Sequence, residues 1–155
     1  MLKKIYRILI SFLYRFKFFS SGFGLRIHFP IKLHYSKNIK IGNNVSIFEN
    51  TWFNCIDSED KPSLIIGDNC SIGRFAHINA YKSVVIENNV VIAERVHISD
   101  CSHNYSLSDK PIIDQGTEFV EKVLIKSGSW IGSGAVILPG VSIGKNAIVG
   151  ANAVV

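Results

Sequence analysis

The chain has few of the residues that mark several common protein classes. Its three cysteines are scattered and none forms a C-x-x-C pair, so neither a disulfide framework nor a paired-cysteine zinc site is indicated. A reducing, cytoplasmic compartment fits this cysteine usage best. The apolar stretch 8–14 is far shorter than the roughly 20 residues that span a bilayer. Arg15 and Lys17 follow it without an A-x-A-like cleavage site, which argues against a signal peptide.

Acidic residues are absent from the first part of the chain. Residues 1–40 hold nine of the 17 Lys and Arg and no Asp or Glu, whereas residues 41–155 hold the other eight and all twelve acids. The net charge of +5 therefore divides into +9 and −4. This is a basic arm on an acidic body, which is not the charge distribution of a nucleic-acid-binding fold, and we expect no nucleic-acid partner.

The sequence has instead a strict period of six. Aliphatic side chains recur at every sixth position near the end of the chain: Ile125, Ile131, Ile137, Ile143, Val149 and Val155. The fifth place of each hexad is small or Val. This period fits neither an amphipathic helix nor a simple alternating strand. It predicts a coil of three short strands, in which every third hexad stacks on the coil below.

The same pattern returns upstream in three sets that begin at Ile41, Ile66 and Ile86. Two extra residues precede the third set, so the stacking predicts Ile78 beneath Ile98 and His77 beneath His97. Polar pairs fall where the corners of the coils are expected: Asn43–Asn44, Asp68–Asn69 and Asn88–Asn89. Such residues tolerate the left-handed conformation of tight corners.

These patterns divide the chain into an arm, 1–40, and a coil domain, 41–155. The longest interruption of the coil, 99–124, contains Asp100 and His103. A loop of this length within a compact domain is often functional, although a solvated insertion is the simpler alternative.

The arm has two interpretations that can hold together. It can cap the open first coil, which a stack of repeats requires. Alternatively, residues 1–24 can form an amphipathic helix that contacts the membrane surface through aromatic and basic side chains.

The run from Trp130 to Val155, WIGSGAVILPGVSIGKNAIVGANAVV, resembles the hexapeptide-repeat O-acetyltransferases. Within them it is most similar to the branch that holds galactoside and maltose acetyltransferases and the acetyltransferases of surface polysaccharides. The resemblance covers about 41–155. It implies an all-β fold, a left-handed parallel β-helix, preceded here by a basic, apolar, helical segment. It further implies a homotrimer and acetyl-CoA as cosubstrate, with no metal.

The resemblance also implies roles for individual residues. His103 matches the catalytic histidine, Asn79 an asparagine near the acceptor and acetyl group, and Trp130 a tryptophan that lines the active site. Ser133 and Ala151 match positions whose backbone contacts the pantetheine arm of acetyl-CoA. In relatives the chain continues beyond the position of Val155 into a basic tail that binds the coenzyme's phosphates, so we expect a truncated sequence.

A histidine is suited to this chemistry because its pKa lies near neutrality. We expect His103 to take the proton from an acceptor hydroxyl as that oxygen attacks the thioester. Asp100 would orient His103, and Asn79 or a backbone amide would stabilise the oxyanion. The predicted function is acetyl transfer to a sugar hydroxyl of a cell-surface polysaccharide or its precursor, at the inner face of the cytoplasmic membrane.

Two alternatives from other classes stay open. The γ-type carbonic anhydrases share this coil and bind zinc with three histidines, for which His77, His97 and His103 would be the candidates. They lack the coenzyme pattern of residues 130–155. The other alternative is a non-catalytic trimeric scaffold that the arm tethers to a membrane.

Overall fold

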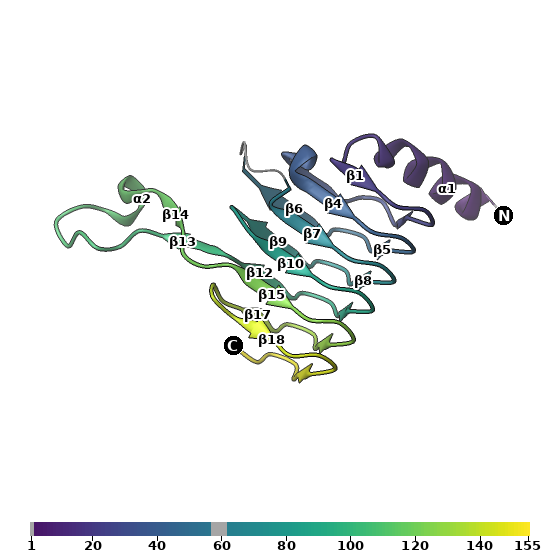
Figure 1. The fold of residues 1–155 in the computed structure, drawn as a ribbon. Helices are drawn as coiled ribbons and strands as arrows, with labels where there is room; N and C mark the ends of the chain where they lie inside the picture. The colour runs from purple at the N-terminus through teal and green to yellow at the C-terminus, as the bar shows by residue number, and fades with distance from the viewer. Residues whose placement is uncertain (1, 57–61) are drawn as a thin grey trace.

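The computed structural model of the chain describes residues 2–56 and 62–155. It is a stack of coils with three parallel sheets as its sides, preceded by a helix (Figure 1). The strands of the stack, in chain order, are β1 (Ser20–Ser21), β2 (Arg26–Ile27), β3 (Lys32–His34), β4 (Ile39–Ile41), β5 (Ser46–Ile47), β6 (Trp52–Cys55), β7 (Leu64–Ile66), β8 (Ser71–Ile72), β9 (His77–Ala80), β10 (Val84–Ile86), β11 (Val91–Ile92), β12 (His97–Ser99), β15 (Val123–Ile125), β16 (Trp130–Ile131), β17 (Val136–Ile137), β18 (Ser142–Ile143) and β19 (Ile148–Val149).

Each sheet collects every third strand. The first sheet has the order β1-β4-β7-β10-β15-β18, the second β19-β16-β11-β8-β5-β2 and the third β17-β12-β9-β6-β3. The predicted register is confirmed, since Ile98 pairs with Ile78 and His97 with His77. The aliphatic side chains of the hexads point inward as far as Val149 and form one continuous core, whereas Val155 is exposed.

The predicted corners adopt the left-handed conformation at Asn44, Asn69 and Asn89, with φ of 56°, 57° and 59°. Their side chains form a ladder in which Asn44 Nδ2 donates to Asn69 Oδ1 and Asn69 Nδ2 donates to Asn89 Oδ1, both at 3.2 Å. Coils approach closely here: a Cβ on Gly67 would lie 2.8 Å from the backbone of Asn88. Glycine therefore permits the stacking distance at this corner.

The coils begin upstream of the expected boundary between 1–40 and 41–155. Strands β1, β2 and β3 already form a complete coil, in which Ser21 pairs with Ile41 and Leu33 pairs with Phe53. The six-residue spacing is present at 21, 27 and 33, but Ser21 replaces the first aliphatic residue. This substitution weakens the pattern and explains why the first coil is not visible as part of the repeat.

Helix α1 (Leu2–Arg15) covers the open end of that coil (Figure 1). The buried Ser11 hydroxyl accepts a hydrogen bond from Ile27 N at 2.9 Å and donates to Arg7 O at 2.7 Å. Ile10 and Tyr14 pack against the core. The helix thus satisfies an edge N–H of β2 and shields the apolar end of the stack. In the described part of the chain, no helix is long and apolar enough to cross a membrane.

The interruption at 99–124 is a hairpin that projects from the stack (Figure 1). Strand β13 (Cys101–His103) pairs antiparallel with β14 (Thr117–Phe119), and the short helix α2 (Ile112–Gln115) lies between them in sequence. Residues 123–124 already belong to β15. The insertion is therefore shorter and more regular than the expected loop. A short 3-10 turn, η1 (Ser36–Asn38), completes the elements.

Candidate active site

A cleft of about 380 Å³ lies where the hairpin leaves the third sheet. The outward side chains of β6, β9 and β12 form one wall, and β13 and β14 form the other. The residues that line it are Asn54, Asn79, Tyr81, His97, Ser99, Cys101, Ser102, His103, Thr117, Leu138 and Pro139. The structure thus brings together Asn79 and His103, two of the residues expected at the site.

Asp100 occupies the base of the hairpin and is fully buried. Its carboxylate accepts three backbone hydrogen bonds, from the N–H groups of Tyr81 at 2.8 Å, Lys82 at 2.8 Å and Ser83 at 2.7 Å. Both oxygens are therefore directed at the turn of the preceding coil. The carboxylate therefore fastens the hairpin to the stack, and the role expected of Asp100 in orienting His103 stays a prediction.

His103 is exposed at the end of β13, and its Nδ1 lies 3.3 Å from Thr117 Oγ1 on the opposite strand. If Nδ1 carries the proton and donates to that hydroxyl, the lone pair of the neutral ring lies on Nε2. His103 also lines a second hollow, of about 530 Å³, which extends along the hairpin to Ser106 and Val120. Its ring therefore borders two adjoining spaces, which share Leu138 and Pro139.

Amide side chains form a hydrogen-bonded row along the third sheet towards this cleft. His34 Nδ1 lies 3.1 Å from Asn54 Oδ1, and Asn54 Nδ2 donates to Asn79 Oδ1 at 3.0 Å. Asn79 pairs in turn with Ser99 on the next strand. The row fixes the orientation of the Asn79 amide and presents polar groups to the cleft.

A second row on the same face is aromatic. Trp52 stacks on His77 with ring centroids 4.2 Å apart, and His77 meets His97 edge-on at 5.1 Å. Burial lowers the pKa of His97, and burial together with the charge of His97 lowers the pKa of His77. Both rings therefore tend to be neutral near pH 7. Among the described residues no group of three His, Cys, Asp or Glu side chains could hold a metal ion.

The other three expected site residues lie elsewhere on the chain. Trp130 is half-exposed on the second sheet, between Val91 and Ile148 of neighbouring coils. Ser133 and Ala151 lie at the corner between the second and third sheets, one coil apart. Ser133 Oγ donates to Glu94 Oε2 at 3.0 Å, and Ser133 O accepts from Asn152 N at 2.9 Å.

Several lining residues were not expected from the sequence, and Thr117 and Asn54 show two different reasons. Thr117 lies in the insertion, where no period indicates which residue faces His103. Asn54, in contrast, lies one coil below Asn79 in the pairing register. The stacking of the hexads was sufficient to place it, because residues that pair on one face share a direction.

Comparison with known families supports the repeat. Residues 122–155 match the family model described as "Bacterial transferase hexapeptide (six repeats)", and residues 63–93 match "Hexapeptide repeat of succinyl-transferase". WbbJ of Escherichia coli K12, whose name assigns it to lipopolysaccharide biosynthesis as an O-acetyl transferase, is 29% identical over 135 residues. That alignment covers 83% of this chain and 67% of WbbJ. These matches, and the likeness to WbbJ, support the hexapeptide-repeat O-acetyltransferase family that the sequence resembles.

Solved structures confirm the left-handed parallel β-helix. AntD, an N-acyltransferase from Bacillus cereus in complex with dTDP and 3-hydroxybutyryl-CoA, superposes with a TM-score of 0.78 at 22% identity. The match covers 94% of this chain and 77% of AntD. A galactoside acetyltransferase in complex with coenzyme A gives a TM-score of 0.58 at 25% identity, covering 90% and 56%. The class expected from the sequence, an acyltransferase that uses an acyl-coenzyme A, is confirmed by these relatives.

The chain spans between 33% and 72% of the length of the curated relatives that it matches. These relatives therefore do not by themselves establish the acceptor or the assembly of this protein.

Proposed function

We propose that this protein transfers an acetyl group from acetyl-CoA to a hydroxyl of a sugar, in a cell-surface polysaccharide or its precursor, with His103 as the general base. One observation carries the proposal: the His103 ring borders two adjoining hollows at the hairpin. A base in this reaction must reach the acceptor hydroxyl at the moment when that oxygen attacks the thioester carbon, so it has to lie where the two substrates meet.

The proposed transfer needs one base and no covalent intermediate on the enzyme. Nε2 of His103 takes the proton of the acceptor hydroxyl while its oxygen bonds to the thioester carbon. The tetrahedral intermediate then breaks its C–S bond, and the leaving coenzyme A sulfur takes the proton back from Nε2. The Thr117 hydroxyl lies beside Nδ1 and can accept a hydrogen bond from it, and a ring that donates from Nδ1 accepts at Nε2.

In this proposal Asn79 binds the acceptor or the developing oxyanion. Its Oδ1 already accepts from Asn54 at 3.0 Å, so its Nδ2 group faces away from that bond as a donor. A fixed donor of this kind contributes several kcal/mol where it meets the oxyanion. The neighbouring amide of Asn54 adds a second polar group on the same wall, which suits a hydroxyl-rich acceptor.

We further propose a homotrimer in which a neighbouring subunit completes the site. In a single chain, Trp130 lies on the second sheet and Ser133 and Ala151 on the adjacent corner, whereas His103 lies beyond the third sheet. The sides of a three-sided coil face different directions, so one chain does not gather these residues. Packing of the corner of one copy beside the hairpin of another would bring Trp130, Ser133 and Ala151 to His103.

N-acylation of a nucleotide-linked amino sugar is the second candidate. Its support is the likeness to AntD, an N-acyltransferase in complex with dTDP, at a TM-score of 0.78. The same base would serve, because an ammonium group must lose a proton before it attacks. Identical assays with paired amino and hydroxy sugars, free and nucleotide-linked, distinguish the two activities by which member of each pair accepts the acetyl group.

The N-terminal arm suggests where in the cell the protein acts. Residues 1–24 combine a basic charge with exposed apolar side chains on α1. We propose that they contact the cytoplasmic membrane surface at its inner face, where lipid-linked sugar precursors would be within reach of the cleft.

The decisive experiment measures release of the coenzyme A thiol from acetyl-CoA over a panel of sugar acceptors. We expect acceptor-dependent release that His103→Ala lowers by a factor of 100 to 10,000, the usual contribution of a general base. His28→Ala, in a corner remote from the cleft, is the matched control and should leave the rate unchanged. Full activity of His103→Ala would remove this residue from the mechanism, and the absence of both coenzyme A binding and acetyl transfer would favour the scaffold.

A further inference from the structure

Helix α1 has more apolar surface than its capping role requires. Its packed face consists of Ser11, Ile10 and Tyr14. The opposite face is apolar as well and is exposed at Ile5, Tyr6, Ile8, Leu9, Phe12 and Leu13, each to 48–59%, and Phe16 just after the helix is exposed to 68%. These residues are spaced three or four apart and form one stripe along the helix. A continuous exposed stripe of this kind marks an interaction surface.

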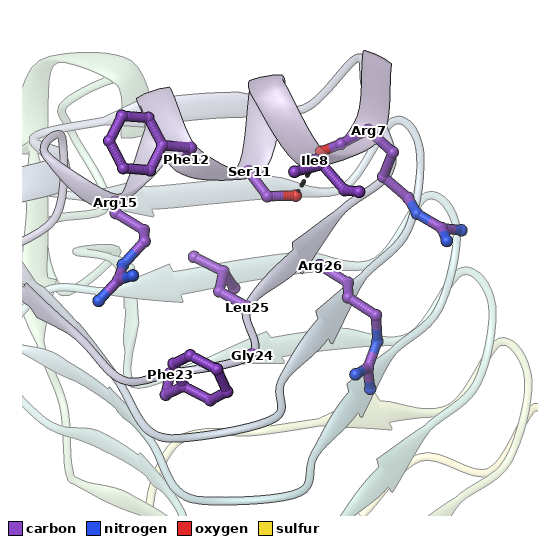
Figure 2. A pocket seen from close by; sticks show the side chains of 9 residues that line it. All are labelled: Arg7, Ile8, Ser11, Phe12, Arg15, Phe23, Gly24, Leu25 and Arg26. Carbon is purple, nitrogen blue, oxygen red and sulfur yellow. Dashed lines mark hydrogen bonds between the residues drawn. The ribbon is translucent and has the colours of Figure 1, made fainter. Parts of the chain in front are cut away.

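A groove of about 380 Å³ runs beside this stripe, between α1 and residues 23–26 (Figure 2). Ile8 and Phe12 extend from the helix above it, and Leu25 and Phe23 lie below. Figure 2 shows guanidinium groups at its two sides: those of Arg7 and Arg26 on one, and that of Arg15 on the other. The groove is therefore apolar in the middle and cationic at its margins.

The charge around the groove has one sign. Its lining residues include three arginines and no Asp or Glu, and the chain has no acidic residue before Glu49. Arg26 is held in place because its Nε donates to Ser46 Oγ at 2.9 Å and its Nη2 to Asn44 O at 3.3 Å. A guanidinium fixed in this way keeps further N–H groups for a phosphate, which Arg binds in a planar, forked geometry.

We propose that this groove binds an anionic membrane lipid, with the phosphate of its headgroup between Arg7 and Arg26 and the adjoining chain along Phe12 and Leu25. Aromatic side chains beside cations are typical of helices that lie in the membrane interface. A second copy of this chain is the less favourable occupant, because contact through α1 would oppose two surfaces that each have nine cations and no acid in residues 1–40. The site refines the proposed membrane contact, on which it rests, and does not depend on acetyl transfer.

The first test measures cosedimentation of the full chain with vesicles of phosphatidylcholine alone or with 30 mol% phosphatidylglycerol. Each cation at an anionic surface contributes about 1 kcal/mol, or about fivefold in affinity. The variant Arg7→Gln/Arg15→Gln/Arg26→Gln should therefore bind the anionic vesicles about 100-fold more weakly. The matched control Lys40→Gln/Lys110→Gln/Lys145→Gln removes three cations outside the groove and should bind within a fewfold of the unmodified chain.

Equal losses in both triple variants would show general electrostatic attraction: the groove proposal would fail while the membrane contact survived. Binding that is indifferent to phosphatidylglycerol, or self-association of the chain that Phe12→Ser abolishes, would overturn both. Thermal melting of each variant confirms that α1 still caps the stack, and acetyl transfer to a soluble acceptor reports separately on the catalytic proposal.

The second test distinguishes a lipid from a free phosphate. Decyl phosphate, below its micelle concentration, should shift the backbone amide resonances of Ser11 and Leu25 at concentrations at least tenfold lower than inorganic phosphate does. Phe12→Ser should remove this difference, because it removes the apolar wall while leaving the three arginines. Equal titration by both compounds would mean that the groove holds an anion alone, and the lipid proposal would be wrong.

Discussion

Replacement of Asp100 by alanine should detach the hairpin from the coil stack. The buried carboxylate accepts N–H···O bonds of 2.7–2.8 Å from three consecutive residues, 81–83. A hydrogen bond to a charged group contributes about 1.5–3 kcal/mol. Lys82 is exposed and its two neighbours are half-buried, so water replaces part of what is lost. We expect a destabilisation of about 3–5 kcal/mol, or about 10 °C in melting temperature.

Amide hydrogen exchange is the sharper assay, because repeat proteins open locally and a single melting temperature averages over coils. Asp100→Ala should accelerate exchange at 81–83 and across the β13–β14 hairpin, and leave β4 to β6 unchanged. Asp100→Asn is the matched variant, since it keeps the shape and one acceptor oxygen but loses the charge. It should show a smaller change of the same kind.

Acetyl transfer in the same variants decides between the two roles of this carboxylate. If Asp100 only positions the hairpin, the rate should fall in proportion to the loss of protection at 81–83, with the pH profile unchanged. Loss of transfer in Asp100→Asn with full protection at 81–83 would refute this reasoning. The carboxylate would then act on the reaction through His103, which is the role expected of it from the sequence.

Variants at three further positions test separate contacts. Thr117→Val should lower the turnover number about tenfold by freeing Nδ1 of His103, whereas Thr117→Ser should retain most activity; equal rates would exclude a role in the tautomer. Ser11→Ala leaves an edge N–H of β2 without its acceptor and should lower the free energy of unfolding by about 1–3 kcal/mol in chemical denaturation; no change would mean that water takes its place. Because the folded-state pKa values of His77 and His97 lie below the ordinary 6.5, the unfolded chain binds more protons on acidification. The contribution of the two neutral rings to the free energy of unfolding is therefore complete above pH 6.5 and is lost as pH falls through 6.5 towards the folded-state pKa values. His97→Phe should flatten the dependence of the melting temperature on pH in this range.

Most of the coil stack was predictable from the sequence because an inward position of a narrow coil accommodates only a buried apolar side chain. A shift of one residue would turn every inward aliphatic out to solvent, so the register is strongly specified. The pairing of Ile98 with Ile78 across an irregular spacing shows this. The first coil was not predicted because Ser21 occupies a position that is aliphatic in the other coils. One polar residue in a set of three is enough to obscure the six-residue recurrence of aliphatic side chains.

The site was predictable only in part, because its second wall is not periodic. The register placed Asn79 on the third sheet, but nothing in 99–124 indicates that Thr117 would face His103 across a hairpin. The backbone groups that bind the Asp100 carboxylate were equally unpredictable from the sequence. The sequence analysis assigned Asp100 to His103, whereas the fold stacks the turn at 81–83 against the carboxylate, about 18 residues away in the chain.

The placement of Trp130, Ser133 and Ala151 shows how the shape of this fold constrains its chemistry. Outward side chains on a three-sided stack diverge, so a flat side offers a row of groups but no enclosure. The hairpin supplies one wall at His103, and a two-substrate reaction needs another, which the corner of a second copy can provide. A pair of variants tests whether a second copy completes the site. His103→Ala and Trp130→Ala should each have impaired transfer, and a mixture of the two should regain part of the activity once the subunits have exchanged. Failure to complement, with exchange verified by mass, would mean that each chain works with its own residues and that Trp130 lies outside the site.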